Sequence, residues 1–517
     1  MSPALVGEGW PAIPYDPEAD GVFLVVVNAG AHKYHLATKH IDLPAAHGLN
    51  TGGRVGFVGA ITNEVQFSSQ LDPFSRDSSN STVSITALED YLPMRKLRAA
   101  GVFSQDIQVD VYWIADGLGL ALTQALHLVS GYMVDPVYDD VSGTVSFVVE
   151  DRGLEGELPF PPVVATVEGL DPQTLDSEHV GKVYPVIFGE VKKTPCLKLS
   201  DDFATWLVMD ERFNELGDSQ ATQIYDGDTA VDIDTQGHLT DDDGNIYYYV
   251  DADTLPTSKD VTVDVTGYEP ATVDEVVRRL FTHYVTDSNL LVDGTLNQLV
   301  IDFDRIDIGM IVNDRMPNAV EFMRDRVVRQ LPAAMIQVGK KYKVQPLLWS
   351  RDATLTLSTD TNIVRTTSYP QETRRSAVFN DFVIRYGRTG LRGDYTGVVL
   401  RNPDTDAQCL RSSEFYGRRA LGDFDAGDIS SVDGAEFIAD WLVATYGKMR
   451  VMVSYACTLE AIGANLWDTV RVVDRNQGWD HGPTFKVVSI GYSTGPLVEL
   501  SLVSVDDYLQ VHNRAYS

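Results

Sequence analysis

The sequence predicts a mainly β protein with α+β insertions, in which two strand-rich blocks bracket a mixed middle. Three observations predict this class: apolar and polar residues alternate near both ends, Gly- and Asp-bearing turns separate the alternating runs, and the middle switches to helical periodicity. The predicted units are a first β domain at 1–165, a connector with acidic β-hairpins at 166–265, a small α/β domain at 266–350, and a second β domain with one helix at 351–517.

The first block contains strands with one apolar face each. Val83, Ile85 and Ala87 alternate with hydroxyl residues, and similar runs begin at Ile107 and Val145. Residues 118–129 fit either a buried strand or a short helix, because their leucines satisfy both patterns. The block therefore predicts a sandwich or a barrel.

The middle begins with a proline-rich stretch at 158–172, which predicts an extended connector. The acidic stretch that follows carries three glycine-bearing pairs between short apolar runs, and these predict consecutive hairpins that turn at each glycine. The three pairs are Asp226-Gly227, Gln236-Gly237 and Asp243-Gly244.

Helical periodicity then takes over. Thr272 and Glu275 predict a capping box at the start of one helix. A second helix is predicted to begin with Pro317 in its first turn and to end before Pro332, and strands near 335–347 complete this unit.

The last block again reads mostly as strands, with one helix. Ala435, Ile438 and Leu442 recur at helical spacing, and Gly447 is placed to end the helix.

Composition excludes several classes of protein. The 517 residues hold 74 acidic and 41 basic side chains, a net charge of −33, which argues against binding to nucleic-acid phosphates or to anionic membrane surfaces. A hydrophobic content of 44% excludes wholesale disorder. Three scattered cysteines follow no metal or disulfide spacing, and neither a signal peptide nor a membrane-length apolar run is visible, so we expect a soluble chain.

The acidic residues are concentrated in one stretch of the chain and are mostly aspartate. Residues 201–253 hold fifteen acids and a single base, Arg212, for a net charge of −14. Over the whole chain 54 Asp accompany 20 Glu, and 28 Arg accompany 13 Lys. This usage is typical of a halophilic protein, in which salt screens self-repulsion, and equally of a GC-rich genome.

Motifs for catalysis and cofactor binding are absent from the sequence. No G-x-S-x-G, H-E-x-x-H or P-loop pattern occurs, so we expect no enzyme and no cofactor. Four histidines fall within sixteen positions, but the residues around them predict a polar loop rather than a metal site; they are His32, His35, His40 and His47. A group of aspartates could supply oxygen ligands to Ca²⁺, but their spacing is not that of a calcium-binding loop. The alternative is that they form the solvated face of a hairpin. The group is Asp226, Asp228, Asp232 and Asp234, with Asp241, Asp242 and Asp243 beyond it.

Arginine gathers at 370–420. Arginine suits bidentate pairing with carboxylates, so this zone predicts a subunit interface that would take the acidic stretch at 201–253 of a neighbouring copy. The interface candidates are Arg374, Arg375, Arg385, Arg388, Arg418 and Arg419, with Arg392, Arg401 and Arg411 nearby.

Four segments resemble the baseplate hub, or tail-tip hub, proteins of tailed bacterial and archaeal viruses. In the last of them Trp467-Asp468 stands where the family usually has Gly-Asp. The segments are YDDVSGTVSFVVEDR at 138–152, GKVYPVIFG at 181–189, NDFVIRY at 380–386, and the helix 435–446 followed by 451–459, 465–470 and 485–490.

The resemblance implies two β-barrels of the tail-tube type that bracket the α/β and hairpin domains, so that three copies imitate a six-fold ring. It implies a homotrimer in the virion of a long-tailed virus, at the tail tip or baseplate, assembled in the host cytoplasm. The implied partners are a distal tail protein ring, a tape-measure protein, and a tip, spike or fibre protein. Viral DNA would pass through without specific binding, along an acidic wall that repels it, and the chain would not insert into a membrane.

Two rival functions remain open at this point. A hexameric distal tail protein would have one barrel and six copies per particle. A tail-borne polysaccharide hydrolase would need paired carboxylates in a cleft, and acids are too abundant here to single out a pair.

Overall fold

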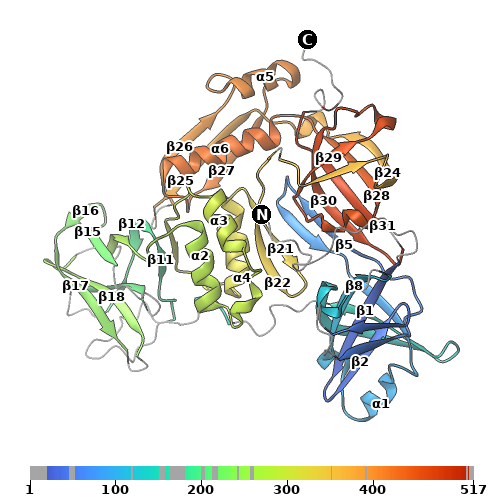
Figure 1. Cartoon of the computed structure of the whole chain (residues 1–517). Helices are drawn as coiled ribbons and strands as arrows, with labels where there is room; N and C mark the ends of the chain where they lie inside the picture. Colours follow the sequence, from blue (N-terminus) through green and yellow to red (C-terminus); the bar gives the residue numbers. More distant parts are fainter. Residues whose placement is uncertain are drawn as a thin grey trace.

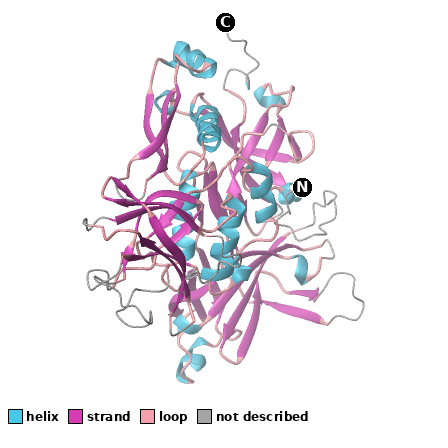
Figure 2. Cartoon of the chain, turned by 90° about the vertical axis from the view of Figure 1, so that its left-hand side faces the viewer, coloured by secondary structure: helices cyan, strands magenta, loops and turns pink. Residues whose placement is uncertain are grey.

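The computed structural model shows several β-sheets around a central group of helices (Figures 1 and 2). It describes residues 20–45, 53–117, 120–150, 158–161, 181–199, 204–211, 219–241, 244–256, 261–350, 352–389, 393–495, 497–507 and 511. The predicted class, mainly β with α+β insertions, is confirmed. No described helix has the length and apolar content of a membrane span.

The first sheet curls into a barrel. Ile61, which follows β4 in sequence, links the end strand β7 to β2. It forms a β-bridge with Ala87 of β7, and its amide donates to the Ala37 carbonyl of β2 at 3.1 Å. These contacts close the sheet through β2 and β7. The strand order is β3 (Ile41–Pro44), β4 (Arg54–Gly59), β2 (His32–Ala37), β1 (Gly21–Ala29), β8 (Gln108–Ala115), β9 (Leu126–Asp139), β10 (Thr144–Glu150) and β7 (Val83–Leu88).

The alternating pattern of the first block is confirmed in β7, β8 and β10, whose buried residues alternate with more exposed ones. The ambiguous segment at 118–129 contains both a short 3₁₀ turn, Leu122–Gln124, and the start of β9. Helix α1 (Met94–Ala99) lies at one end of this barrel (Figure 1).

The last part of the chain forms a second large sheet. The two strands at its opposite edges, β23 and β24, follow each other in sequence and are joined by the turn at 359–362. In this turn the Asn362 side chain accepts from the Ser358 amide at 2.8 Å. The order is β23 (Leu355–Ser358), β29 (Thr469–Val473), β30 (Thr484–Tyr492), β31 (Leu497–Ser504), β28 (Val451–Thr458) and β24 (Ile363–Glu372).

A hairpin from the first block completes this second sheet. Strand β5 (Phe67–Asp72) pairs antiparallel with the end of β30, and β6 (Asp77–Asn80) pairs with β5. In Figure 1 the blue β5 lies against red strands. Beside it, the Trp113 indole donates to the Ser493 carbonyl at 3.1 Å, and the Tyr492 ring lies 6.4 Å from Phe67 and 5.4 Å from Trp113. The two β units are therefore joined by backbone pairing, whereas the predicted boundary at 165 stays a prediction.

The acidic hairpins form two facing four-stranded sheets, at the left of Figure 1. The predicted turns at Gly227 and Gly244 are confirmed, since both adopt positive φ between strands. The predicted turn at Gly237 is wrong: Gly237 lies inside β17, where an added Cβ would come 3.3 Å from the Tyr249 ring. The sheets are β12 (Glu190–Pro195), β19 (Val261–Thr266), β15 (Gln220–Asp226) and β16 (Thr229–Val231), and then β13 (Leu197–Lys198), β14 (Thr205–Asp210), β18 (Ile246–Ala252) and β17 (Ile233–Thr240).

The central unit holds three helices and two short sheets. Thr272 is the N-cap of its first helix but makes no side-chain cap bond, so the predicted capping box is wrong. Its third helix is confirmed, although Asn318 rather than Pro317 begins it, by accepting from the Glu321 amide at 2.9 Å. The elements are α2 (Val273–Arg279), α3 (Thr295–Asp302), α4 (Ala319–Phe322, continued by irregular turns to Gln330), and the pairs β11 (Val186–Phe188) with β20 (Met310–Val312) and β21 (Ala333–Val338) with β22 (Lys341–Pro346).

The last block contains a smaller α/β layer besides its sheet. The predicted helix is confirmed as α6 (Val432–Tyr446), which ends at Gly447. A second helix, α5 (Ala407–Tyr416), was not predicted; Asp406 caps it by accepting from the Gln408 and Cys409 amides. The three-stranded sheet of this layer has the order β26 (Tyr395–Arg401), β25 (Asp381–Arg388) and β27 (Ala420–Ala426).

Trp467 takes the backbone conformation that its place in the turn requires. Its φ of +71° is in the left-handed region that favours glycine, although the residue here is tryptophan. Its indole donates to the Leu348 carbonyl at 3.1 Å and meets Trp349 edge-on at 4.8 Å. These contacts offset a backbone strain of about 1 kcal/mol.

Lys486 lies beside Trp467 and is 4% exposed, with its ammonium 5.5 Å from the indole centre. Burial lowers the pKa of Lys486 to about 8, against the opposing pull of Asp468 and Asp302. The second sheet therefore contains a lysine whose charged form is disfavoured by its surroundings.

We expect Tyr492→Ala to destabilise the protein by about 3–5 kcal/mol, because it empties the junction between the two β units. Chemical denaturation measures the loss. Hydrogen exchange should accelerate at the amides of β5, which pairs at this point. Tyr492→Phe keeps the ring and serves as the control; unchanged exchange in β5 for the alanine variant would contradict the account.

We expect Lys486→Met to remove a pH dependence of stability. Below about pH 8 the lysine is charged in both states, whereas between about 8 and its ordinary 10.5 only the unfolded chain keeps the proton. The free energy of unfolding of the parent therefore rises through this window, by about 2–3 kcal/mol relative to the variant. Urea titrations across the window measure the difference. The exposed Lys96→Met is the control, and parallel curves for parent and Lys486→Met would refute the expectation.

Candidate functional site

The four aspartates considered as calcium ligands lie in the hairpin unit but do not converge. Asp228 pairs with the Lys193 ammonium at 3.1 Å, while Asp232 and Asp234 are exposed. Within the described residues, no three His, Cys, Asp or Glu side chains gather as metal ligands do. The Asp241 carboxylate accepts from Asn245 and from the Tyr247 hydroxyl, and Asp242 and Asp243 lie outside the described residues.

The histidine cluster also spreads out. His32 and His35 belong to β2, and His40 follows in the next turn. Burial, with a contribution from Lys33, lowers the pKa of His35, whose ring lies 5.0 Å from Phe57. His47 lies outside the described residues.

One group of side chains was not predicted and has the composition of a catalytic triad. Ser130 donates to the Asp110 carboxylate at 2.6 Å, and the His127 Nε2 lies 3.4 Å from the same carboxylate. Burial would raise the pKa of Asp110, but the bonds from His127 and Ser130 lower it. The hydroxyl bonds to the carboxylate rather than to the imidazole, so His127 does not occupy the position of the base in a catalytic triad.

This group instead connects the first barrel to the central unit. Val129 bridges to Gly339 in the turn between β21 and β22, and an added Cβ at Gly339 would come 2.9 Å from the His127 ring. The close approach requires glycine at this turn.

The predicted interface arginines divide into two groups. The first group pairs with carboxylates of its own α/β layer, so its charges are already compensated. Its ion pairs are Arg385 with Asp423 at 2.6 Å, Arg388 with Asp425, and Arg418 with Asp381 at 2.8 Å and Asp404 at 3.0 Å; the neighbouring Arg401 pairs with Asp440 at 2.9 Å.

The second group has no carboxylate partner among the described residues. The Arg375 guanidinium donates to the Phe415 carbonyl at 2.9 Å and so caps the end of α5, while Arg419 donates to the Arg375 carbonyl at 3.1 Å. Arg374 is exposed beside them. Arg392 lies outside the described residues. Arg374, Arg375 and Arg419 are thus the predicted interface arginines that lack a carboxylate partner in the described part of the chain, and the interface itself stays a prediction.

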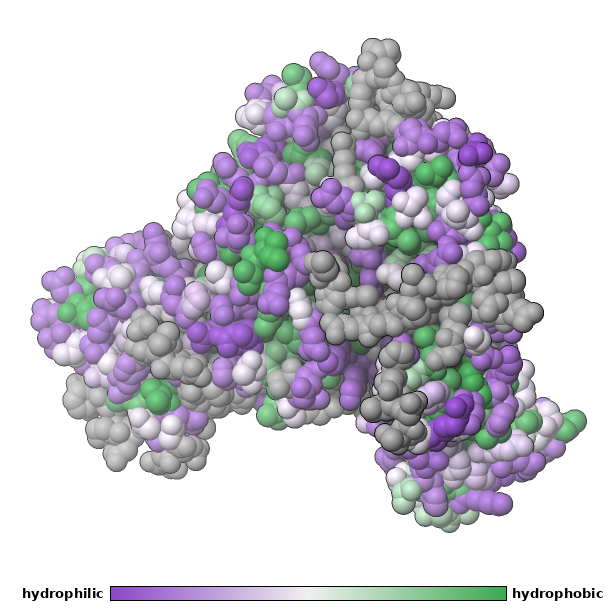
Figure 3. Space-filling view, in the orientation of Figure 1, coloured by the Kyte–Doolittle hydropathy of each residue, from purple (hydrophilic) through white to green (hydrophobic). Residues whose placement is uncertain are grey.

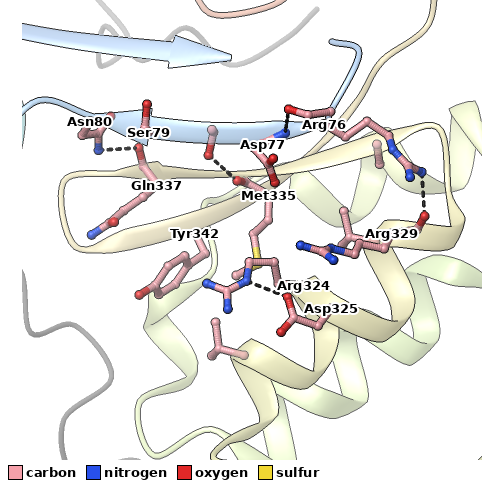
Figure 4. A pocket seen from close by; sticks show the side chains of 15 residues that line it. Arg76, Asp77, Ser79, Asn80, Arg324, Asp325, Arg329, Met335, Gln337 and Tyr342 are labelled. Carbon is pink, nitrogen blue, oxygen red and sulfur yellow. Dashed lines mark hydrogen bonds and ion pairs between the residues drawn. The ribbon is translucent and has the colours of Figure 1, made fainter. Parts of the chain in front are cut away.

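A cavity of about 510 Å³ opens between β6, β21 and the helix that begins with α4. Figure 4 shows Arg324 and Arg329 reaching into it from the helix, with β6 as the opposite wall. Arg324 pairs with Asp325 at 3.0 Å. Ser78 spans the gap between the strands by donating to the Met335 carbonyl at 2.6 Å.

Arg76 holds the two sides of this cavity together. Its guanidinium donates to the carbonyls of Arg329 at 2.6 Å and Leu331 at 3.1 Å, and it lies within 6 Å of the Phe424 and Trp441 ring centres. Burial lowers the pKa of Arg76. It lies in the turn between β5 and β6 and belongs to no periodic pattern, so its role could not be predicted from the sequence.

In the part of the chain that the structure describes, the charged side chains named above either tie units together or lie on the surface without a carboxylate partner, and the Ser130 hydroxyl does not bond to the His127 imidazole.

We expect Arg76→Ala to destabilise the protein by about 2–4 kcal/mol, because two carbonyls lose their donor and two aromatic rings lose a stacked cation. Arg329→Ala, in the same cavity but exposed, should change stability by about 0.5 kcal/mol or less. Thermal unfolding of both variants measures the contrast, and equal losses would contradict the role given to Arg76.

No protein-family model and no curated protein matches the sequence. Solved structures similar to the chain include two tail proteins. One is a tail protein from Neisseria meningitidis MC58, with a TM-score of 0.38 and 10% identity over 93% of this chain and 96% of that one. The other is the 43 kDa tail protein of prophage MuSo2 from Shewanella oneidensis, with a TM-score of 0.39 and 12% identity over 93% of this chain and 99% of that one. Both structural neighbours are thus described as tail proteins, the second of them from a prophage.

Proposed function

We propose that this chain is a structural protein of a viral tail, a trimeric hub that links the six-fold tail tube or distal tail ring to a three-fold tip, spike or fibre. The observation that carries the proposal is the presence of two strand-built units from opposite ends of the chain. The first closes through Ile61 and Ala87, and the second is completed by β5 from the first block.

This arrangement suits a change of symmetry. If each chain contributes two similar β units to a ring, three copies supply six of them. The pairing of β5 with β30 holds the two units of one chain in a defined relation. A ring built in this way has six-fold contacts on one side and three-fold contacts on the other.

Charge supports a role as a conduit wall. At −33 the chain repels duplex DNA over about a Debye length, roughly 10 Å at 0.1 M salt, so DNA would pass without being held. Figure 3 shows a surface on which hydrophilic residues prevail over small, scattered hydrophobic areas. The partners are then a distal tail ring, a tape-measure protein and a tip protein, met in the virion after assembly in the host cytoplasm.

Symmetry and copy number test the proposal. We expect purified protein to sediment at three times the mass of the 57.0 kDa chain, and cryo-EM of particles to show three copies at the tail tip. Six copies in a ring would favour a distal tail protein instead. A chain that stays monomeric at high concentration in low as well as high salt, and is missing from purified tails, would overturn the proposal.

A further inference from the structure

We propose that neighbouring copies of this chain bind each other through a cationic patch of Arg374, Arg375 and Arg419 around Phe415 on one copy, and an acidic patch of Asp232, Asp234 and Asp253 on the next. The inference rests on the proposed function in that it requires a ring of identical copies. It names the surfaces that make the ring.

The cationic patch is a local exception in an acidic protein. Phe415 is 37% exposed at the end of α5, and Arg375 donates to its carbonyl. The Arg419 guanidinium donates to the Arg375 carbonyl, so it lies beside the backbone of Arg375. Arg411 is exposed one helical turn before Phe415, and Glu414 is the exposed acid of that turn. Cations therefore outnumber acids here.

The acidic patch lies at one end of β17 and β18. The Asp253 amide donates to the Asp232 carbonyl at 3.0 Å, which places these residues side by side, and Asp234 is two residues farther on. All three are exposed and have no cationic partner among the described residues. Leu255, 57% exposed, follows Asp253 and gives this patch an apolar element to match Phe415.

One chain does not bring its own two patches together. In Figures 1 and 2 α5 lies at the top of the molecule, and the unit that contains β16 and β17 lies well below it in both views. Two different patches that bind each other make a head-to-tail contact, which closes into a ring when the rotation between copies allows it.

A second copy fits the cationic patch better than a nucleic acid does. Arg385, Arg388, Arg401 and Arg418 of this layer are compensated by carboxylates, so the described arginines without an ionic partner form a small cluster near α5, and the net charge of −33 repels phosphate backbones. The neighbouring copy carries the complementary charge at matching size, and arginine pairs with carboxylates bidentately.

Charge reversal tests the contact. Sedimentation velocity compares the parent with Arg374→Glu/Arg419→Glu and with Asp232→Lys/Asp253→Lys; neither pair includes Arg375, which caps α5. Each double variant should raise the dissociation constant at least about tenfold, and the parent should dissociate as salt rises. The quadruple variant, with both patches reversed, should restore assembly.

Arg98→Glu/Arg365→Glu is the matched control for Arg374→Glu/Arg419→Glu, because it changes net charge by the same amount at exposed arginines elsewhere. Circular dichroism confirms that each variant folds. If the parent assembles and the patch variants assemble as well as the control, this contact is wrong while the hub remains. If the parent stays monomeric at every concentration, both this contact and the trimer are contradicted. If both double variants fail to assemble and the quadruple variant assembles, the two patches are identified as partners.

Discussion

The pairing of β5 with the end of β30 is the contact on which the rest of the architecture depends. It places backbone from the first block inside the second sheet, and Tyr492 packs there against Phe67 and Trp113. From this junction the hairpin β5–β6 also reaches the central unit, through Arg76 and Ser78. Three units thus meet on one hairpin, so any function that needs a fixed geometry between them depends on it.

Charge is used in two ways in this molecule. Inside, isolated cations such as Arg76 and Lys486 are held by carbonyls and aromatic rings, at a cost in desolvation. Outside, several arginines of the last block are compensated by nearby aspartates, whereas those at one end of α5 have no carboxylate partner among the described residues. The position of the unpaired charges, rather than the total of −33, is what distinguishes one surface from another.

Local patterns predicted the strands and α6 well, because burial of one face imposes a period that the residues show directly. They failed where a distant contact decides the structure. Gly237 resembles a turn residue but lies in a strand beneath Tyr249, and α5 was missed because few of its side chains are buried. Which arginines pair with carboxylates of the same chain could not be predicted from the sequence either, since Asp423 meets Arg385 only after β27 aligns with β25.

The junction also sets an order of events during synthesis. Trp113 and Ser493 are 380 residues apart, so a ribosome that adds about 5–20 residues per second takes on the order of 20–80 s to deliver the second partner after the first. Until then β5 has an unpaired edge and the second sheet does not exist. The junction between the two β units can therefore form only after the last strands leave the ribosome, so the relative position of the two units is fixed at the end of synthesis.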